Sequence, residues 1–215
     1  MTPTRRLLLL SPALLLTPSL LRAQGASGPL PAAADPHRAE HGLGRDDAPV
    51  RVTEWYSLTC SHCARFSAGV FPQIQKELID TGKLRYVFAD YPLDKPALLA
   101  AQILRYAAPD RYEPLSALLL STQRRWAFGQ GVNPKDEIAK IVALAGLSRA
   151  QVDAAAADTA LRDAILTEQD DAKSRLSVDS TPTFIFNGPK AHDRAEAGEL
   201  SFAEFAAIVN EVAGA

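Results

Sequence analysis

The chain has 215 residues and a formal net charge of −2 at pH 7, from 23 Lys and Arg against 25 Asp and Glu. This length supports one good-sized hydrophobic core, or a core that carries an inserted subdomain. The slightly acidic balance, without a cluster of Lys or Arg, argues against nucleic acid as a partner.

The first 26 residues have the layout of a secretory signal peptide. Arg5 and Arg6 precede an apolar stretch over residues 7–21, and small and polar residues follow. These 15 residues contain two prolines and fall short of the roughly 20 that a membrane-spanning helix needs. The arginine pair also resembles a twin-arginine signal, but such pairs are common in ordinary leaders, so the general secretory (Sec) route is favoured. We therefore expect an exported protein.

The cysteine content is informative, because the chain has two cysteines, Cys60 and Cys63, three positions apart. An exported protein meets an oxidising compartment, where a disulfide is expected. A bridge across two intervening residues closes a very short loop and removes little entropy from the unfolded chain. The pair therefore indicates a disulfide that is made and broken rather than a structural one.

The elements up to residue 80 follow from composition and spacing. Residues 27–49 are rich in Ala, Gly, Pro and Asp without a sustained period, and we expect a loose N-terminal arm. Residues 50–56 alternate and carry β-branched and aromatic side chains, which predicts a strand. A helix is predicted over residues 60–80, because apolar residues recur every fourth position on one face. Pro72 is expected to kink this helix.

The rest of the chain changes character twice. Residues 84–89 predict a second strand, after which residues 96–176 have helical spacing and no strand signal. Four or five helices are predicted there, the last over residues 160–176. Strand character returns at residues 183–186, and a turn and a possible further strand follow. An amphipathic helix over residues 202–212 closes the chain.

This order predicts an α/β fold in which helices are inserted into a small sheet. The strand–helix–strand start favours a right-handed parallel unit, which the closing strands and helix complete. The predicted organisation is a signal peptide over residues 1–26, an arm over 27–49, an α/β domain formed by 50–94 and 177–215, and an all-helical subdomain over 95–176.

The position of Cys60 gives it particular chemistry. Directly after a strand and at the start of a helix, its sulfur would face free N–H groups and the positive end of the helix dipole, which favour thiolate. Cys63 would lie about one turn deeper and more sheltered. His62 can carry a positive charge or donate a hydrogen bond to sulfur. Because a stabilised thiolate is a good leaving group, the disulfide form would be a strong oxidant.

Two further features are candidates for the same site. Glu54 lies six residues before Cys60 on the predicted strand, where its carboxyl could relay a proton to or from Cys63, or could be a solvated strand glutamate. Thr181 and Pro182 precede the third strand. A cis peptide bond there would present the backbone of Thr181 to an extended substrate, although most X–Pro bonds are trans.

The run Glu-Trp-Tyr-Ser-Leu-Thr-Cys-Ser-His-Cys over residues 54–63 resembles the active-site strand and helix start of the DsbA family of periplasmic oxidoreductases. Residues 88–93, the helical insertion and residues 178–184 occur in the order of that family. The resemblance covers about residues 48–213. It implies a thioredoxin-like fold with an inserted all-helical subdomain, thiol:disulfide oxidoreductase activity, a periplasmic location and no cofactor or metal.

The resemblance also implies roles for individual residues. Cys60 takes the place of the exposed nucleophile, Cys63 that of its buried partner and Glu54 that of the buried acid, with His62 beside them in the catalytic group. Pro182 takes the place of the cis-proline that faces the disulfide.

Substrate is expected to meet Ser61, Thr181 and Pro182. Two of these positions depart from the commonest family pattern. Ser61 stands where proline is commonest, and Thr181 stands where many strong oxidases have valine. Thr181 is found more in isomerase-like and other branches. Both departures leave open whether the protein mainly forms or rearranges disulfides.

The favoured function is the oxidation of cysteine pairs in unfolded or reduced secreted proteins. By resemblance, the protein would be re-oxidised by a membrane quinone-linked oxidase of the DsbB type, and we expect it to be a monomer. A disulfide isomerase or reductase of the same fold is the nearest alternative, but dimeric isomerases carry an N-terminal dimerisation domain for which residues 27–49 are too short.

Two other classes of protein are weaker alternatives. A metal-binding protein could use Cys60, His62 and Cys63 as soft ligands, although a closed tetrahedral site needs more than these. An exported structural module with an inert bridge is the last alternative.

Overall fold

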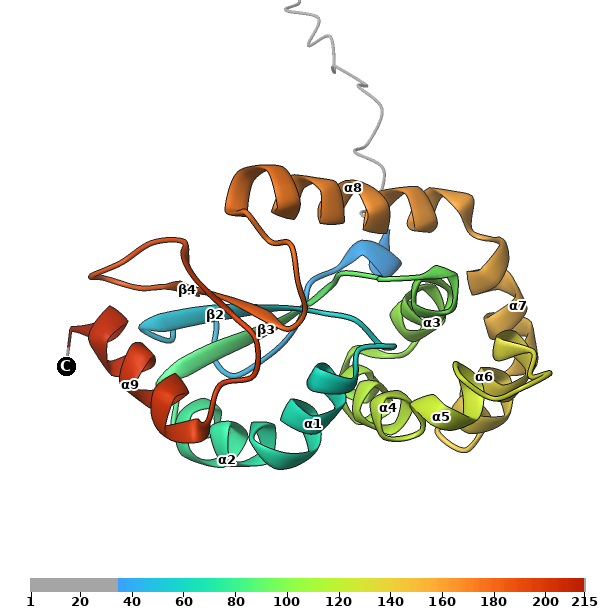
Figure 1. Cartoon of the computed structure of the whole chain (residues 1–215), viewed down its shortest axis with the longest axis horizontal. Helices are drawn as coiled ribbons and strands as arrows, with labels where there is room; N and C mark the ends of the chain where they lie inside the picture. Colours follow the sequence, from blue (N-terminus) through green and yellow to red (C-terminus); the bar gives the residue numbers. More distant parts are fainter. Residues whose placement is uncertain (1–34, 215) are drawn as a thin grey trace, which may run out of the picture. The chain divides into compact units, whose positions relative to one another are not determined.

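The computed structural model describes residues 35–214, and the predicted signal peptide lies outside them (Figure 1). Its centre is a five-stranded sheet with the strand order β1-β3-β2-β4-β5. The strands are β1 (His41–Leu43), β2 (Val50–Tyr56), β3 (Leu84–Asp90), β4 (Thr183–Asn187) and β5 (Arg194–Ala197). The parallel pair β2–β3 lies at the centre and the other neighbours pair antiparallel. The predicted parallel unit and the possible last strand are therefore confirmed.

Strand β2 lies at the centre of the sheet, and its side chains alternate between buried and partly exposed positions. The odd-numbered residues of β2 are partly exposed. The even-numbered residues are buried on one face: Val50, Val52, Glu54 and Tyr56. The apolar residues of that face belong to one hydrophobic core together with aromatic residues of β3, β4 and the helices, and Glu54 is buried among these core positions of the strand.

The first helix is broken into three segments: α1 (Ser61–Gly69), the four-residue α2 (Phe71–Ile74) and the π-helical η2 (Gln75–Ile79). The predicted kink is present, and it lies at Val70, just before Pro72. Pro72 falls in the first turn of α2, where a missing N–H leaves no helical hydrogen bond unmade. With α9 (Phe202–Ala213), these segments lie on one side of the sheet, and α8 lies on the other (Figure 1).

Six helices, rather than the predicted four or five, lie between β3 and β4. They are α3 (Lys95–Arg105), α4 (Pro109–Ser121), α5 (Gln123–Trp126), α6 (Pro134–Ala143), α7 (Arg149–Ala157) and α8 (Thr159–Leu176). The count was wrong because α5 is a single turn, too short to show a period in sequence. The division of the chain into a domain and an inserted subdomain stays a prediction.

The predicted loose arm over residues 27–49 is wrong at residues 41–43, which form strand β1. A three-residue edge strand there pairs antiparallel with β3, and His41 stacks on Tyr112 at a ring separation of 3.9 Å. Gly42 permits this pairing, because a Cβ atom there would lie 2.7 Å from the carbonyl oxygen of Tyr86. So short a strand carries no alternation that sequence analysis can detect.

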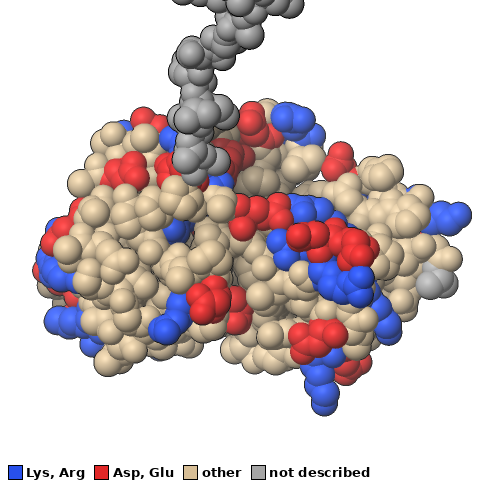
Figure 2. All heavy atoms as spheres, turned by 180° about the vertical axis from the view of Figure 1, so that it is seen from behind, with Lys and Arg blue, Asp and Glu red and all other residues tan. Residues whose placement is uncertain are grey.

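Charges on the described surface are mixed. On the face shown in Figure 2, Lys and Arg lie beside Asp and Glu, and no broad area of one sign is visible there. Within residues 35–214 no helix combines the length and the apolar character that crossing a bilayer requires.

Candidate active site

Cys60 sits where strand β2 passes into helix α1. Residues 57–59 make the turn, and Cys60 is the N-cap residue of α1 rather than its first helical residue. Its sulfur accepts a hydrogen bond from the backbone N–H of Cys63 at 3.4 Å. The sulfur therefore occupies the place where helix N-termini ordinarily hold a capping oxygen.

This setting favours the thiolate of Cys60. A hydrogen bond from the Cys63 thiol is the main reason that the pKa of Cys60 falls to about 5, and the backbone N–H groups of Cys63 and His62 lower it further. At neutral pH the group is therefore mostly ionised.

Cys63 has the opposite surroundings. Its side chain is fully buried, and burial raises the pKa of its thiol well above the ordinary value. Both cysteines are free thiols in this structure. The two sulfurs of one short motif thus differ in charge and in access, and Cys63 needs a base before it can act as a nucleophile.

Glu54 is buried beneath the cysteines, so the alternative of a solvated strand glutamate is wrong. Its side chain is 5% exposed, and the Tyr86 hydroxyl donates a hydrogen bond to its Oε2 atom at 2.7 Å. Burial raises the pKa of Glu54 to about 7, and the nearby charge of Cys60 adds to the rise. The Glu54 charge in turn raises the pKa of Cys63, so the two groups are close enough to interact.

The loop before β4 closes over the sulfur of Cys60. The Thr181–Pro182 peptide bond is cis, and the carbonyl oxygen of Thr181 lies 3.3 Å from the Cys60 sulfur. The N–H of Gly198 donates to the carbonyl oxygen of Pro182 at 2.8 Å and holds this loop from the other side. The backbone of Thr181 is therefore brought to the site as expected.

The ring of His62 is exposed and points elsewhere than expected. Its Nδ1 atom lies 2.8 Å from a carboxylate oxygen of Glu199, which Arg65 also contacts at 2.7 Å. The ring therefore engages a carboxylate, and the group of His62 that acts on Cys60 is its backbone N–H. Ser61 is exposed at the start of α1, beside Cys60.

Three residues at the site had escaped the sequence analysis. Tyr86 pairs with Val52 in the sheet and faces the same side as Glu54, a placement that the strand alternation could have indicated. Glu199 lies in the loop before α9. Gln123, a buried residue of α5, donates from Nε2 to the carbonyl oxygens of Leu58 at 2.8 Å and Cys60 at 2.9 Å. No local pattern marks Gln123 or Glu199.

The described residues also bear on metal binding. Among residues 35–214, no group of three or more His, Cys, Asp and Glu side chains is arranged to hold a metal ion. Cys60, His62 and Cys63 are neighbours in sequence, but the His62 ring lies on Glu199 instead. The geometry is that of a thiol pair with a buried carboxyl group.

Comparison with known proteins agrees with this geometry. The family model described as Thioredoxin matches residues 37–211. A protein of Rickettsia conorii with the provisional name protein-disulfide oxidoreductase is 26% identical over 147 residues, which make up 68% of this chain and 52% of that protein. The chain thus spans about half the length of this curated relative. Disulfide bond formation protein D of Bacillus subtilis is 33% identical over 92 residues, 39% of this chain and 41% of that protein.

Solved structures extend the likeness over most of the described residues. Alpha-DsbA1 of Wolbachia pipientis matches with a TM-score of 0.74 and 26% identity, covering 86% of this chain and 93% of that one. BdbD of Bacillus subtilis matches with a TM-score of 0.68 and 21% identity, covering 82% and 94%, and supports the fold alone. The chain therefore belongs to the thioredoxin family and, within it, is a DsbA-like protein.

Proposed function

We propose that this chain is an exported thiol:disulfide oxidoreductase that oxidises cysteine pairs in reduced secreted proteins through a Cys60–Cys63 disulfide. The observation that carries the proposal is the contrast between the two thiols. Cys60 has a pKa lowered to about 5 at a helix N-terminus, whereas Cys63 is buried and its pKa is raised. A disulfide that releases a stabilised thiolate is readily reduced, and so oxidises its substrate.

The reaction runs in two exchanges. A substrate thiolate attacks the sulfur of Cys60, a mixed disulfide forms, and the bond to Cys63 breaks. Cys63 leaves as a thiolate and takes a proton from the protonated form of Glu54. A second substrate thiolate then attacks the substrate sulfur of the mixed disulfide, and Cys60 leaves as a thiolate. The substrate has lost two electrons, which now reside in the dithiol of the protein.

Substrate would bind in extended form beside the loop of Thr181 and Pro182, with Ser61 next to the reacting sulfur. We infer action in the periplasm as a monomer, and re-oxidation by a membrane quinone-linked oxidase of the DsbB type. The likeness to DsbA structures supports this inference, and the signal-peptide pattern of residues 1–26 supports export.

A redox titration of the purified protein against glutathione tests the proposal. We expect a reduction potential nearer to the roughly −120 mV of DsbA than to the roughly −270 mV of thioredoxin. A Cys60→Ala variant, which cannot form the disulfide, serves as the control. A potential near that of thioredoxin would contradict the oxidase function and favour a reductase.

An isomerase is the second candidate, because Thr181 precedes the cis-proline where many strong oxidases have valine. Refolding of a substrate with scrambled disulfides separates the two functions. An oxidase accelerates bond formation in reduced substrate but adds little to the rearrangement of wrong bonds, whereas an isomerase accelerates the rearrangement.

A further inference from the structure

The loop between β5 and α9 contacts two parts of the active site. The N–H of Gly198 donates to the carbonyl oxygen of Pro182 at 2.8 Å, and the side chain of the next residue, Glu199, contacts α1. The Nδ1 atom of His62 lies 2.8 Å from Oε1 of Glu199, and Nη2 of Arg65 lies 2.7 Å from the same oxygen. One loop therefore contacts both the cis-proline and the dipeptide between the two cysteines.

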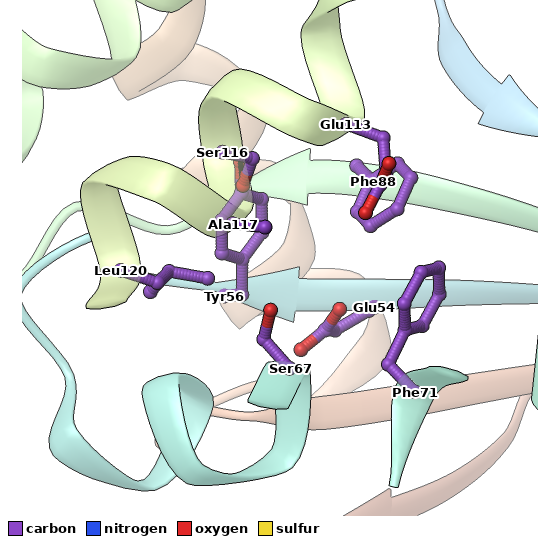
Figure 3. Close-up of a pocket in the computed structure, with 9 residues that line it drawn as sticks. All are labelled: Glu54, Tyr56, Ser67, Phe71, Phe88, Glu113, Ser116, Ala117 and Leu120. Carbon is purple, nitrogen blue, oxygen red and sulfur yellow. Dashed lines mark hydrogen bonds between the residues drawn. The ribbon is translucent and has the colours of Figure 1, made fainter. Parts of the chain in front are cut away.

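Two carboxyl groups lie near the start of α1, and their surroundings differ. Glu54 lies in the core beside Ser67 and Phe71 (Figure 3), and Tyr86 donates a hydrogen bond to it. Glu199 lies at the surface with its side chain 33% exposed, and its ion pairs with described residues are those with the two side chains of α1. The buried carboxyl group therefore acts on the sulfurs, whereas the surface carboxylate acts on the side chain between them.

The His62 ring could have a second partner of negative charge. A protonated imidazole is a cation and a hydrogen-bond donor, so it can contact either a carboxylate or a thiolate. His62 follows Cys60 by two residues, and a cation at the sulfur would stabilise the thiolate. Among the described residues, no hydrogen bond joins this ring to the Cys60 sulfur. The pKa of Cys60 is lowered mainly by the Cys63 thiol, and backbone N–H groups add to the effect. The contact with Glu199 thus occupies a ring that the thiolate could otherwise use.

We propose that Glu199 is a positioning residue that holds the His62 ring away from the Cys60 sulfur, and so makes the disulfide a weaker oxidant than the same motif with a free ring. The inference rests on the proposed function, in which reduction of the disulfide releases the Cys60 thiolate. A ring that contacts this thiolate would stabilise the reduced form and raise the reduction potential. Arg65 supports the hold, because it fixes the same carboxylate oxygen from α1.

Substitution of Glu199 in two backgrounds tests the proposal. In the reduced wild-type background, we expect Glu199→Gln to lower the pKa of Cys60 by about 0.5–1 unit, because the released ring can turn to the thiolate. In the His62→Ala background, the same substitution should shift that pKa by less than about 0.3 unit, because no ring remains to move. Thiolate absorbance against pH measures all four proteins, and the cycle isolates the part of the effect that passes through His62.

A redox titration against glutathione gives a second measurement. At pH 6, where histidine side chains are ordinarily protonated, Glu199→Gln should shift the equilibrium constant about three- to tenfold toward the reduced protein. This corresponds to a rise in reduction potential of about 15–30 mV. The shift should be absent when His62→Ala is also present.

Glu211→Gln is the matched control. Glu211 is an exposed residue in the last turn of α9 and pairs with Arg194 at 2.6 Å, so its substitution also removes a surface carboxylate from an ion pair. This variant should leave the pKa of Cys60 and the equilibrium constant unchanged. Because exposed ion pairs contribute little to stability, both variants are expected to fold.

Three results would overturn the proposal. The first is an unchanged pKa of Cys60 in Glu199→Gln. The second is an equal shift in the His62→Ala background, since the carboxylate would then act on the sulfur directly or through a released Arg65. The third is a shift of the same size in Glu211→Gln, which would reflect a general loss of surface charge.

The outcome is separable from that of the proposed function. Each variant is compared with its own background, so the sign of the change does not depend on the potential of the wild type. A thioredoxin-like potential of the wild type rejects the oxidase function alone, whereas an unchanged potential in Glu199→Gln rejects the role of Glu199 alone.

Discussion

Cys60 and Cys63 meet opposite surroundings within one turn of helix α1. The Cys60 sulfur caps the helix and its pKa falls to about 5, whereas burial raises the pKa of Cys63. The stabilised thiolate exists in the reduced protein and disappears when the disulfide forms. The free energy of unfolding is therefore tied to the redox state.

We expect the reduced protein to be more stable than the oxidised one at pH 7, by a few kcal/mol. Because the pKa of Cys60 is lowered, its thiolate contributes fully to the free energy of unfolding of the reduced protein above pH 9.0, the ordinary thiol pKa. This contribution is lost as pH falls through about 5. The short disulfide loop offsets little of this. Urea denaturation of both forms between those pH values measures the difference, and a more stable oxidised form at pH 7 would refute it.

Glu54 gives the opposite pH dependence. Its pKa is raised from 4.5 in the unfolded chain to about 7 in the folded protein. The contribution of protonated Glu54 to the free energy of unfolding is therefore complete below pH 4.5 and is lost as pH rises through about 7. We therefore expect the effect of Glu54→Gln on the free energy of unfolding to depend on pH. The effect at pH 8 should be more favourable than the effect at low pH by up to about 3 kcal/mol, because glutamine cannot ionise. Urea denaturation of the wild type and the Glu54→Gln variant over this pH range measures the difference. Parallel pH profiles would show that Glu54 titrates normally.

The contact between His62 and Glu199 changes what a substitution at His62 should do. The sequence predicted that the ring acts on the sulfur, but the group near Cys60 is the backbone N–H, which any residue retains. We expect His62→Ala to raise the pKa of Cys60 by less than about one unit, because an exposed charge acts weakly through water. Thiolate absorbance against pH measures the shift. A rise of several units would mean that the ring turns to the sulfur.

At the scale of elements, the sequence predicted those helices and strands whose own residues show a periodic pattern or a capping motif. Strand β2 alternates, and α9 begins with a capping box of Ser201 and Glu204. The short elements β1 and α5 escaped, because a three-residue strand and a single turn owe their structure to partners far along the chain. Gln123 is the clearest case, since its role depends on two carbonyl groups more than 60 residues away.

We expect Gln123→Leu to lower the free energy of unfolding by about 1–3 kcal/mol, because two buried carbonyl groups lose their donor. The exposed Gln130→Leu is the matched control and should change stability by at most about 0.5 kcal/mol. Urea denaturation at one pH compares the two. Equal effects of both substitutions would show that the contact of Gln123 with the active-site turn contributes nothing.

At the scale of the whole molecule, a buried ion pair joins the sheet to the helices between β3 and β4. Arg105 of α3 contacts Asp90 at the end of β3 at 2.7 Å and Glu168 of α8 at 3.1 Å. Arg105 and Asp90 are both buried. The order of elements could be predicted from sequence, but this convergence of three distant charges could not, because it depends on how the helices pack on the sheet.

We expect Arg105→Leu to reduce the free energy of unfolding by about 3–5 kcal/mol, since it leaves the Asp90 charge buried without its partner. Adding Asp90→Asn should recover part of that loss, because the unpaired charge is removed as well. Thermal and urea denaturation of the single and double variants measure both effects. Additive losses would show that the two residues are not coupled.

The hydrogen bonds of Gln123 set a condition for shortening this chain by design. A minimal scaffold that joins β3 directly to β4 would keep the cysteines, Glu54 and the loop of Pro182. It would also leave the carbonyl groups of Leu58 and Cys60 without the donor that now holds them. A designer who removes the helices must therefore supply a new donor at this turn, or accept a redox motif whose backbone is no longer fixed.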